Sequence, residues 1–294
     1  MVPFRQTCAG RLAQELTPRA RVYAFGVSAS PLSQYLVFAR YVQATFSPDA
    51  LAVIIIDNDY DQSLLKYNQR PGFHYFVEGV DGRLQLERVD FKRTFLQRFI
   101  RASALARYFA GNADIREVSK PVRRKLASWL ERPSTREPEP EQSRAARRAA
   151  GEESRIGDSK RAVDAFLDRL PKAAGLDPRR IVFVVDGLRP QLYREDRLAL
   201  EAGRYRGVMR RYFMTEAAQR GYELGDLQPV MVDHFGAHRK PFEFRQAETD
   251  AIVDSHWNAL GHELCFDAVA GSAVVSERFP DPGELARGTQ SEAE

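Results

Sequence analysis

Near the end of the chain, residues 254–264 read DSHWNALGHEL and hold two acidic residues, two histidines and an asparagine. A carboxylate two positions before a histidine can orient the imidazole, which then acts as a general base. Asp254 and His256 are therefore a candidate acid–base pair. The alternative without chemistry is that Asn258 or Asp254 caps the last helix. His262, one turn into that helix, is expected only to pack or to form a hydrogen bond.

The histidines give little support for a metal site. The two in this segment are six residues apart, about 600° around a helix, so they would project from different faces. His234 and His238 have the four-residue spacing of a zinc-binding helix, but the Phe-Gly pair between them and Pro241 argue against a helix. We expect neither a metal nor another cofactor. A metal-dependent hydrolase that uses both residues with Asp233 is a weaker alternative.

Two earlier positions could stabilise the negative charge that develops during acyl transfer. Gly26 ends a predicted strand at residues 21–26, and a glycine lets its backbone N–H approach a substrate closely. Asn58 follows the most apolar run of the chain, LAVIII, and its side-chain amide could donate to an oxyanion. Open parallel sheets bind ligands at the carboxyl ends of their strands, so we expect both residues to meet the acid–base pair there.

The elements that must position these residues alternate between strands and helices. A predicted helix at about residues 32–45 separates the strand at 21–26 from LAVIII, which indicates a βαβ unit and a parallel sheet. RIVFVVDG, further along, predicts another buried strand. A four-residue apolar period predicts an amphipathic first helix, marked by Phe4, Cys8, Leu12 and Leu16. The predicted class is α/β.

We expect one domain over residues 1–294, with a disordered polyampholyte insertion at 132–160 and a loose tail at 282–294. The net charge of +4 comes from mixed Arg and Glu, so nucleic acid is not an expected partner. No apolar run approaches the roughly 18 residues that span a bilayer. Cys8 and Cys265 lie far apart in the sequence and predict neither a zinc site nor a disulfide framework.

Three of these segments together resemble the SGNH hydrolases, also called GDSL esterases and lipases. YAFGVSAS is similar to the second sequence block of that family, at Gly26, and IIIDNDYDQS to the third, with Asn58. DSHWNALGHEL is similar to the last block, with Asp254 and His256. The resemblance spans about residues 4–275 and implies a three-layer α/β/α, flavodoxin-like parallel sheet.

The sequence departs from the family pattern in two places. Ile56 stands where the third block usually has glycine. The nucleophile block, Gly-Asp-Ser, occurs only within IGDSK at residues 156–160, inside the expected insertion and after the other blocks, so we treat it as a coincidence. We therefore expect the nucleophilic serine upstream of Met1, on a first strand that this chain lacks. Ser28 and Ser30 are the substitutes within the chain.

The resemblance implies a serine esterase or deacylase that acts on a small-molecule or carbohydrate ester, such as an acetyl group on a sugar. The serine would attack the acyl carbon, His256 would take its proton, and Asp254 would hold the imidazole tautomer. The N–H of Gly26 and the side chain of Asn58 would stabilise the oxyanion. The same site could transfer the acyl group to a sugar hydroxyl. A catalytically inactive domain that binds a glycan or a partner is the other alternative.

Overall fold

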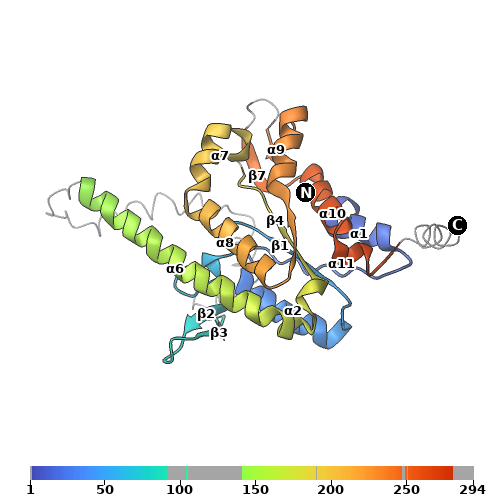
Figure 1. Cartoon of the computed structure of the whole chain (residues 1–294), viewed down its shortest axis with the longest axis horizontal. Coiled ribbons are helices and arrows are strands. Elements are labelled where there is room, and N and C mark those ends of the chain that lie inside the picture. The colour runs from blue at the N-terminus through green and yellow to red at the C-terminus, as the bar shows by residue number, and fades with distance from the viewer. Residues whose placement is uncertain are drawn as a thin grey trace.

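The computed structural model of the chain describes residues 2–91, 104, 141–189, 191–246, 249 and 251–280 (Figure 1). The helices are α1 Cys8–Leu16, α2 Leu32–Phe46, α6 Glu141–Ala174, α7 Glu195–Ala202, α8 Tyr205–Gln219, α9 Leu227–His238, α10 Ala259–Ala270 and α11 Ala273–Ser276. The strands are β1 Leu51–Ile55, β2 His74–Glu78, β3 Leu84–Arg88, β4 Ile181–Val185, β5 Glu223–Asp226, β6 Glu243–Arg245 and β7 Ile252–Trp257. None of the helices in these ranges is long and apolar enough to cross a membrane.

A parallel sheet with the strand order β1-β4-β5 forms the centre of the fold. Leu51 of β1 pairs with Ile181 of β4, and Val182 of β4 pairs with Glu223 of β5. Every residue of β4 is buried, as its uninterrupted apolar sequence predicts for a central strand covered on both faces. The predicted α/β class is confirmed.

Helices pack against both faces of this sheet. Phe183 belongs to a core cluster with side chains of α2, α6 and α8, whereas its neighbour Val184 belongs to a second cluster with side chains of α1, α9 and α10. Successive strand residues point to opposite faces, which explains why adjacent residues of β4 join different clusters. Figure 1 shows α1 and α10 on one side of β4, and α2 and α6 on the other.

The strand predicted at residues 21–26 does not form. These residues belong to no helix or strand, and Tyr23 and Phe25 instead contact α2. The ring centroids of Tyr23 and Phe46 are 4.4 Å apart, and those of Phe25 and Tyr41 are 6.0 Å apart. A strand is held by hydrogen bonds to a neighbouring strand, and none lies beside this segment in the described part of the chain.

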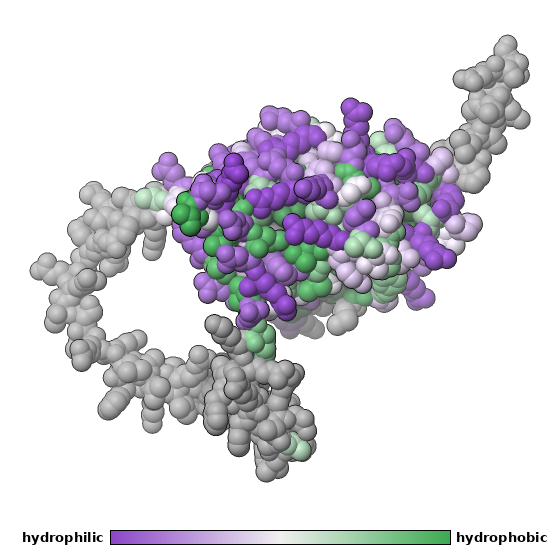
Figure 2. Space-filling view, turned by 90° about the horizontal axis from the view of Figure 1, so that it is seen from below, coloured by the Kyte–Doolittle hydropathy of each residue, from purple (hydrophilic) through white to green (hydrophobic). Residues whose placement is uncertain are grey.

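Apolar side chains are exposed in and next to this segment, and also directly after β1. Figure 2 shows one face of the molecule on which hydrophobic residues are grouped among hydrophilic ones. Beyond Tyr23 and Phe25, the exposed apolar side chains include Val27 at 50% and Ile56 at 40%. Ile56 directly follows β1, one of the two outer strands of the parallel sheet among the described residues.

The disordered insertion expected at residues 132–160 is wrong for residues 141–160, which belong to α6. Their Ala, Arg, Glu and Lys are strong helix formers, so low hydrophobicity did not imply an unfolded segment. Later residues of the same helix, such as Phe166, are fully buried against the sheet. An ion pair of 2.7 Å between Arg155 and Asp61 also holds the helix to the loop that follows β1. Residues 132–140 and the predicted tail at 282–294 lie outside the described residues.

Candidate functional site

Asp254 and His256 lie on β7, which pairs with β6 in an antiparallel hairpin. Asp254 Oδ1 accepts a hydrogen bond of 3.0 Å from the backbone N–H of His256 and lies 2.5 Å from His256 Nδ1. These two hydrogen bonds, the backbone one first, hold the pKa of Asp254 below its usual value. The histidine side chain is 78% exposed, so a reactant can reach its ring.

Arg189 fixes β7 to the end of the central strand. Its guanidinium forms ion pairs with Asp186 at 2.6 Å and Glu243 at 3.2 Å, and it donates a hydrogen bond of 3.1 Å to the backbone oxygen of Ser255. Asp186 directly follows β4, and its Oδ1 also accepts a hydrogen bond of 3.2 Å from Trp257 Nε1. The residue between Asp254 and His256 is therefore held by a buried charge network.

Asn258 and His262, two other polar residues of this segment, have structural roles, as the alternative without chemistry predicts. Asn258 is the N-cap of α10, because its Oδ1 accepts hydrogen bonds from the backbone N–H groups of Leu260 and Gly261 at 3.0 and 3.2 Å. His262 Nδ1 accepts a hydrogen bond of 3.5 Å from the backbone N–H of Cys8. The helix cap and the candidate acid–base pair thus occur side by side in one segment.

Asn58 lies in an exposed turn beyond the carboxyl end of β1, and the buried Asp59 shapes that turn. Asp59 Oδ2 accepts hydrogen bonds of 3.0 Å from the backbone N–H of Ile56 and from the Tyr35 hydroxyl. Burial raises the pKa of Asp59 to about 7, although both hydrogen bonds oppose the shift. The neighbouring Asp57 forms an ion pair of 3.2 Å with Arg206.

The turn that holds Asn58 and the buried Asp186 lie at the same edge of the sheet, beyond the carboxyl ends of β1 and β4. The backbone N–H of Asp186 donates a hydrogen bond of 3.0 Å to the oxygen of Ile55, so the ends of β1 and β4 are joined. Burial raises the pKa of Asp57, and the charges of Asp186 and Arg189 also influence it. Parallel sheets bind ligands at this edge, and Arg189 holds Ser255, the residue between Asp254 and His256, to the segment that follows β4.

Gly26 is not linked to this group by a described hydrogen bond or ion pair. It lies on the exposed segment described above, and the space where a Cβ would project is open. Ser28, just after it, is exposed, whereas Ser30 is buried and its hydroxyl has no hydrogen-bond partner in the described structure. Neither serine has a described contact with His256.

The Gly-Asp-Ser letters at residues 157–159 lie within α6, so they do not form a nucleophile turn. Ser159 is fully buried, and its hydroxyl is 2.8 Å from that of Tyr205. Asp158 forms an ion pair of 2.7 Å with Lys66. These contacts support the interpretation of the Gly-Asp-Ser match as a coincidence. The disorder predicted for this segment, which was part of the argument, was wrong.

His234 and His238 do lie on a helix, α9, contrary to the prediction. Asp226 caps this helix by accepting a hydrogen bond of 2.8 Å from the backbone N–H of Gln228, and Phe235 packs on Tyr193. The cap and this packing outweigh the effect of one glycine. The histidine rings are 4.5 Å apart, but the described residues contain no group of three His, Cys, Asp or Glu arranged to hold a metal.

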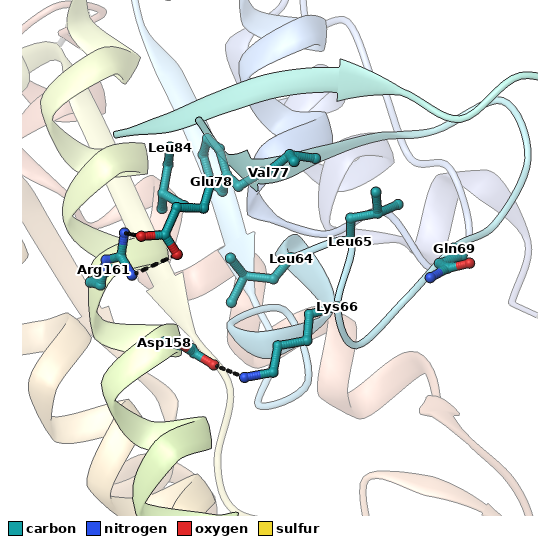
Figure 3. A pocket seen from close by; sticks show the side chains of 10 residues that line it. Leu64, Leu65, Lys66, Gln69, Val77, Glu78, Leu84, Asp158 and Arg161 are labelled. Atoms are coloured by element: carbon teal, nitrogen blue, oxygen red, sulfur yellow. Dashed lines mark hydrogen bonds and ion pairs between the residues drawn. The ribbon is translucent and has the colours of Figure 1, made fainter. Parts of the chain in front are cut away.

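A pocket of about 300 Å³ lies between α6, the β2–β3 hairpin and the loop after β1 (Figure 3). Its charged side chains neutralise one another: Lys66 pairs with Asp158 at 2.7 Å, and Arg161 pairs with Glu78 at 3.1 Å. Leu64 and Leu84 contribute apolar surface. The sequence did not indicate this pocket, because three separate elements form it. Neither a serine nor a histidine lines it.

Comparison with known proteins identifies no family for this chain. No family model, no curated protein and no solved structure matches it. Its function is therefore inferred from the residues and contacts described above.

Proposed function

We propose that this chain forms the body of an SGNH-type serine hydrolase that cleaves a small-molecule or carbohydrate ester. The observation that carries the proposal is the exposed His256, whose Nδ1 lies 2.5 Å from Asp254 on a strand anchored by buried charges. An imidazole held by a carboxylate at one nitrogen leaves the other nitrogen available as a general base.

In the proposed mechanism, a serine hydroxyl attacks the acyl carbon while His256 Nε2 takes its proton. Asp254 keeps the proton of the ring on Nδ1 and stabilises the imidazolium that forms. Asn58 donates a hydrogen bond to the oxyanion of the tetrahedral intermediate. The imidazolium then protonates the leaving alcohol, and a water molecule, activated by the same ring, releases the acid. Gly26 is the proposed second oxyanion donor, once its segment is held in a sheet.

The topology supports the same proposal. The strand order β1-β4-β5 is that expected for the third, fourth and fifth strands of a flavodoxin-like sheet, and helices pack against both of its faces. In that arrangement a further strand would lie between β1 and residues 21–26. We propose that this strand carries the serine, because the described part of the chain presents β1 as an outer strand that is followed by the exposed Ile56.

Hydrolysis of p-nitrophenyl acetate tests the proposal in two proteins. The chain of 294 residues should show only trace hydrolysis, and the protein extended upstream of Met1 by its own coding sequence should be active. In the extended protein, His256→Ala should lower kcat/KM by about 10³-fold or more. His238→Ala, on the exposed end of α9, is the matched control and should leave it unchanged.

Two results would contradict the proposal. An extended protein without hydrolysis would favour the alternative of a binding domain. Robust hydrolysis by the chain itself, lost in Ser28→Ala or Ser30→Ala, would show that the nucleophile lies within the chain.

A further inference from the structure

The two cysteines of the chain, 257 residues apart, meet in the folded protein. Cys8 is the first residue of α1, and Cys265 lies in the middle of α10. Both are free thiols and belong to the same hydrophobic cluster, with exposed fractions of 7% and 0%. The sequence could not indicate this, because only the packing of the first helix on the last long helix brings them together.

Several contacts fix the relative position of α1 and α10 around the thiols. The backbone N–H of Cys8 donates to His262 Nδ1 at 3.5 Å, and His262 lies one turn before Cys265 on α10. One turn further along α1, Arg11 forms an ion pair of 3.0 Å with Glu263. Cys8 and Cys265 belong to the same buried cluster at this helix interface. The neighbouring Cys8 thiol, together with burial, raises the pKa of the Cys265 thiol.

We propose that Cys8 and Cys265 are a disulfide site that covalently joins α1 to α10 under oxidising conditions. The two cysteines lie in one buried cluster between packed helices, and the backbone N–H of Cys8 reaches His262, one turn before Cys265. This close approach is the main geometric requirement for a disulfide bond. The Arg11–Glu263 ion pair and the Cys8–His262 hydrogen bond hold the two helices together beside the cysteines, so the folded structure can accommodate the bond once it has formed.

The oxidant is a small disulfide such as oxidised glutathione. One cysteine thiolate attacks a sulfur of the oxidant, forms a mixed disulfide and releases one glutathione thiolate. The second cysteine thiolate then attacks the cysteine sulfur of the mixed disulfide and releases the second glutathione. The two cysteines lose two protons and two electrons, and the oxidant gains the two electrons. Because only the thiolate reacts, burial slows this exchange, and the bond forms when α1 opens or while the chain folds.

The consequence for the molecule concerns the position of α10. This helix starts at Ala259, directly after β7 and its cap Asn258, so the bond would hold α1 against the helix that follows the candidate acid–base pair. The proposal does not depend on ester hydrolysis, and it can be tested in a protein that has no activity.

The test is oxidative refolding of the whole chain from guanidinium chloride in a glutathione redox buffer. We expect a monomer that has lost two hydrogens by mass spectrometry, with a crosslinked peptide pair containing Cys8 and Cys265. Its melting temperature should exceed that of the reduced chain by roughly 5–10 °C, and dithiothreitol should abolish the difference. Diamide treatment of protein purified under reducing conditions should give the same crosslink.

The matched controls are Cys8→Ala and Cys265→Ala, each of which keeps a small apolar side chain in the core. Neither variant should show the crosslink or a melting temperature that depends on redox conditions. A wild-type chain with native circular dichroism that retains two free thiols after both treatments would overturn the proposal. Glutathione adducts on both cysteines in place of the crosslink would overturn it too.

Discussion

Arg189 is the residue on which the position of β7 most depends, because it contacts three groups at once. It pairs with the buried Asp186 and Glu243 and donates to Ser255 O. Arg189→Met would leave two carboxylates buried without their cation, and we expect a loss of about 3–5 kcal/mol in the free energy of unfolding.

Urea denaturation measures this loss, and Arg194→Met is the matched control. The ion pair of Arg194 with Asp196 has the same chemistry, at 2.9 Å, but both side chains are more than half exposed. Its removal should change the free energy of unfolding by about 0.5 kcal/mol or less. Equal losses in the two variants would show that the buried network does not hold the strand.

Asp59 should make the stability of the fold depend on pH. An aspartate carboxyl has an ordinary pKa of 3.8, which represents the unfolded chain, and burial raises the pKa of Asp59 to about 7 in the fold. Between these pH values the folded state binds more protons, so the contribution of Asp59 to the free energy of unfolding decreases as pH rises from about 4 to about 7. Asp57 and Asp186 add to this shift by repelling the charged form.

Asp59→Asn keeps an oxygen that can accept from Ile56 N and the Tyr35 hydroxyl but removes the titration. Relative to wild type, the variant should gain on the order of 2–4 kcal/mol between pH 4 and pH 8. Denaturant midpoints at these two pH values measure the change. A constant difference between variant and wild type across this range would contradict the role assigned to Asp59.

At the residue scale, the sequence predicted the contacts that are local. Asp254 and His256 are two positions apart, and Asn258 caps the helix that starts beside it, so both follow from short-range chemistry. Asp186 and Arg189 were not predicted as part of the site. Their partners Glu243 and Trp257 are more than 50 residues away, and only the fold brings these charges together. The one local signal for these two residues was Asp186 itself, an acidic residue directly after a predicted buried strand.

At the scale of elements, Gly157→Ala tests whether the first half of α6 is a helix in solution. Gly157 is exposed on this helix, and nothing lies within 4 Å of the Cβ that alanine would add. Alanine should raise the free energy of unfolding by about 0.5–1 kcal/mol if this segment is helical, and should have no effect if it is disordered. Thermal melts followed by circular dichroism measure the difference.

Gly175→Ala is the control with the opposite sign. Gly175 follows α6 with φ +65°, and a Cβ there would lie 2.5 Å from the Gln43 side chain. This change should destabilise the fold by about 1 kcal/mol or more. An equal effect from the two alanines would contradict the described course of α6.

The two elements that were predicted wrongly failed for different physical reasons. For residues 141–160, composition was taken as evidence of disorder, but the apolar residues that hold α6 lie further along the same helix, at Phe166 for example. For residues 21–26, the local pattern predicted a strand, but a strand also requires a neighbour. The residues of β4 have both an apolar local pattern and neighbouring strands, and the prediction of this strand is confirmed.

At the scale of the whole molecule, the outer position of β1 predicts a characteristic hydrogen-exchange pattern. The backbone oxygen of Ile55 accepts a hydrogen bond from Asp186, directly after β4. The backbone N–H and C=O groups of Val53 and Ile55 therefore point toward β4, whereas those of Ala52 and Ile54 point away from it. The amides of Ala52 and Ile54 should exchange at least about tenfold faster than those of Val53 and Ile55. NMR-detected exchange resolves the four amides, and equal protection would show that another strand already covers this edge.

Covalent labelling tests the proposal that His256 is the general base for a serine carried on a strand beside β1. A fluorophosphonate ester reacts with activated serines and is located by mass spectrometry. We expect one labelled serine in the protein extended upstream of Met1, within a Gly-Asp-Ser sequence, and loss of the label in His256→Ala. No label in the extended protein, or a label that persists without His256, would contradict the proposal.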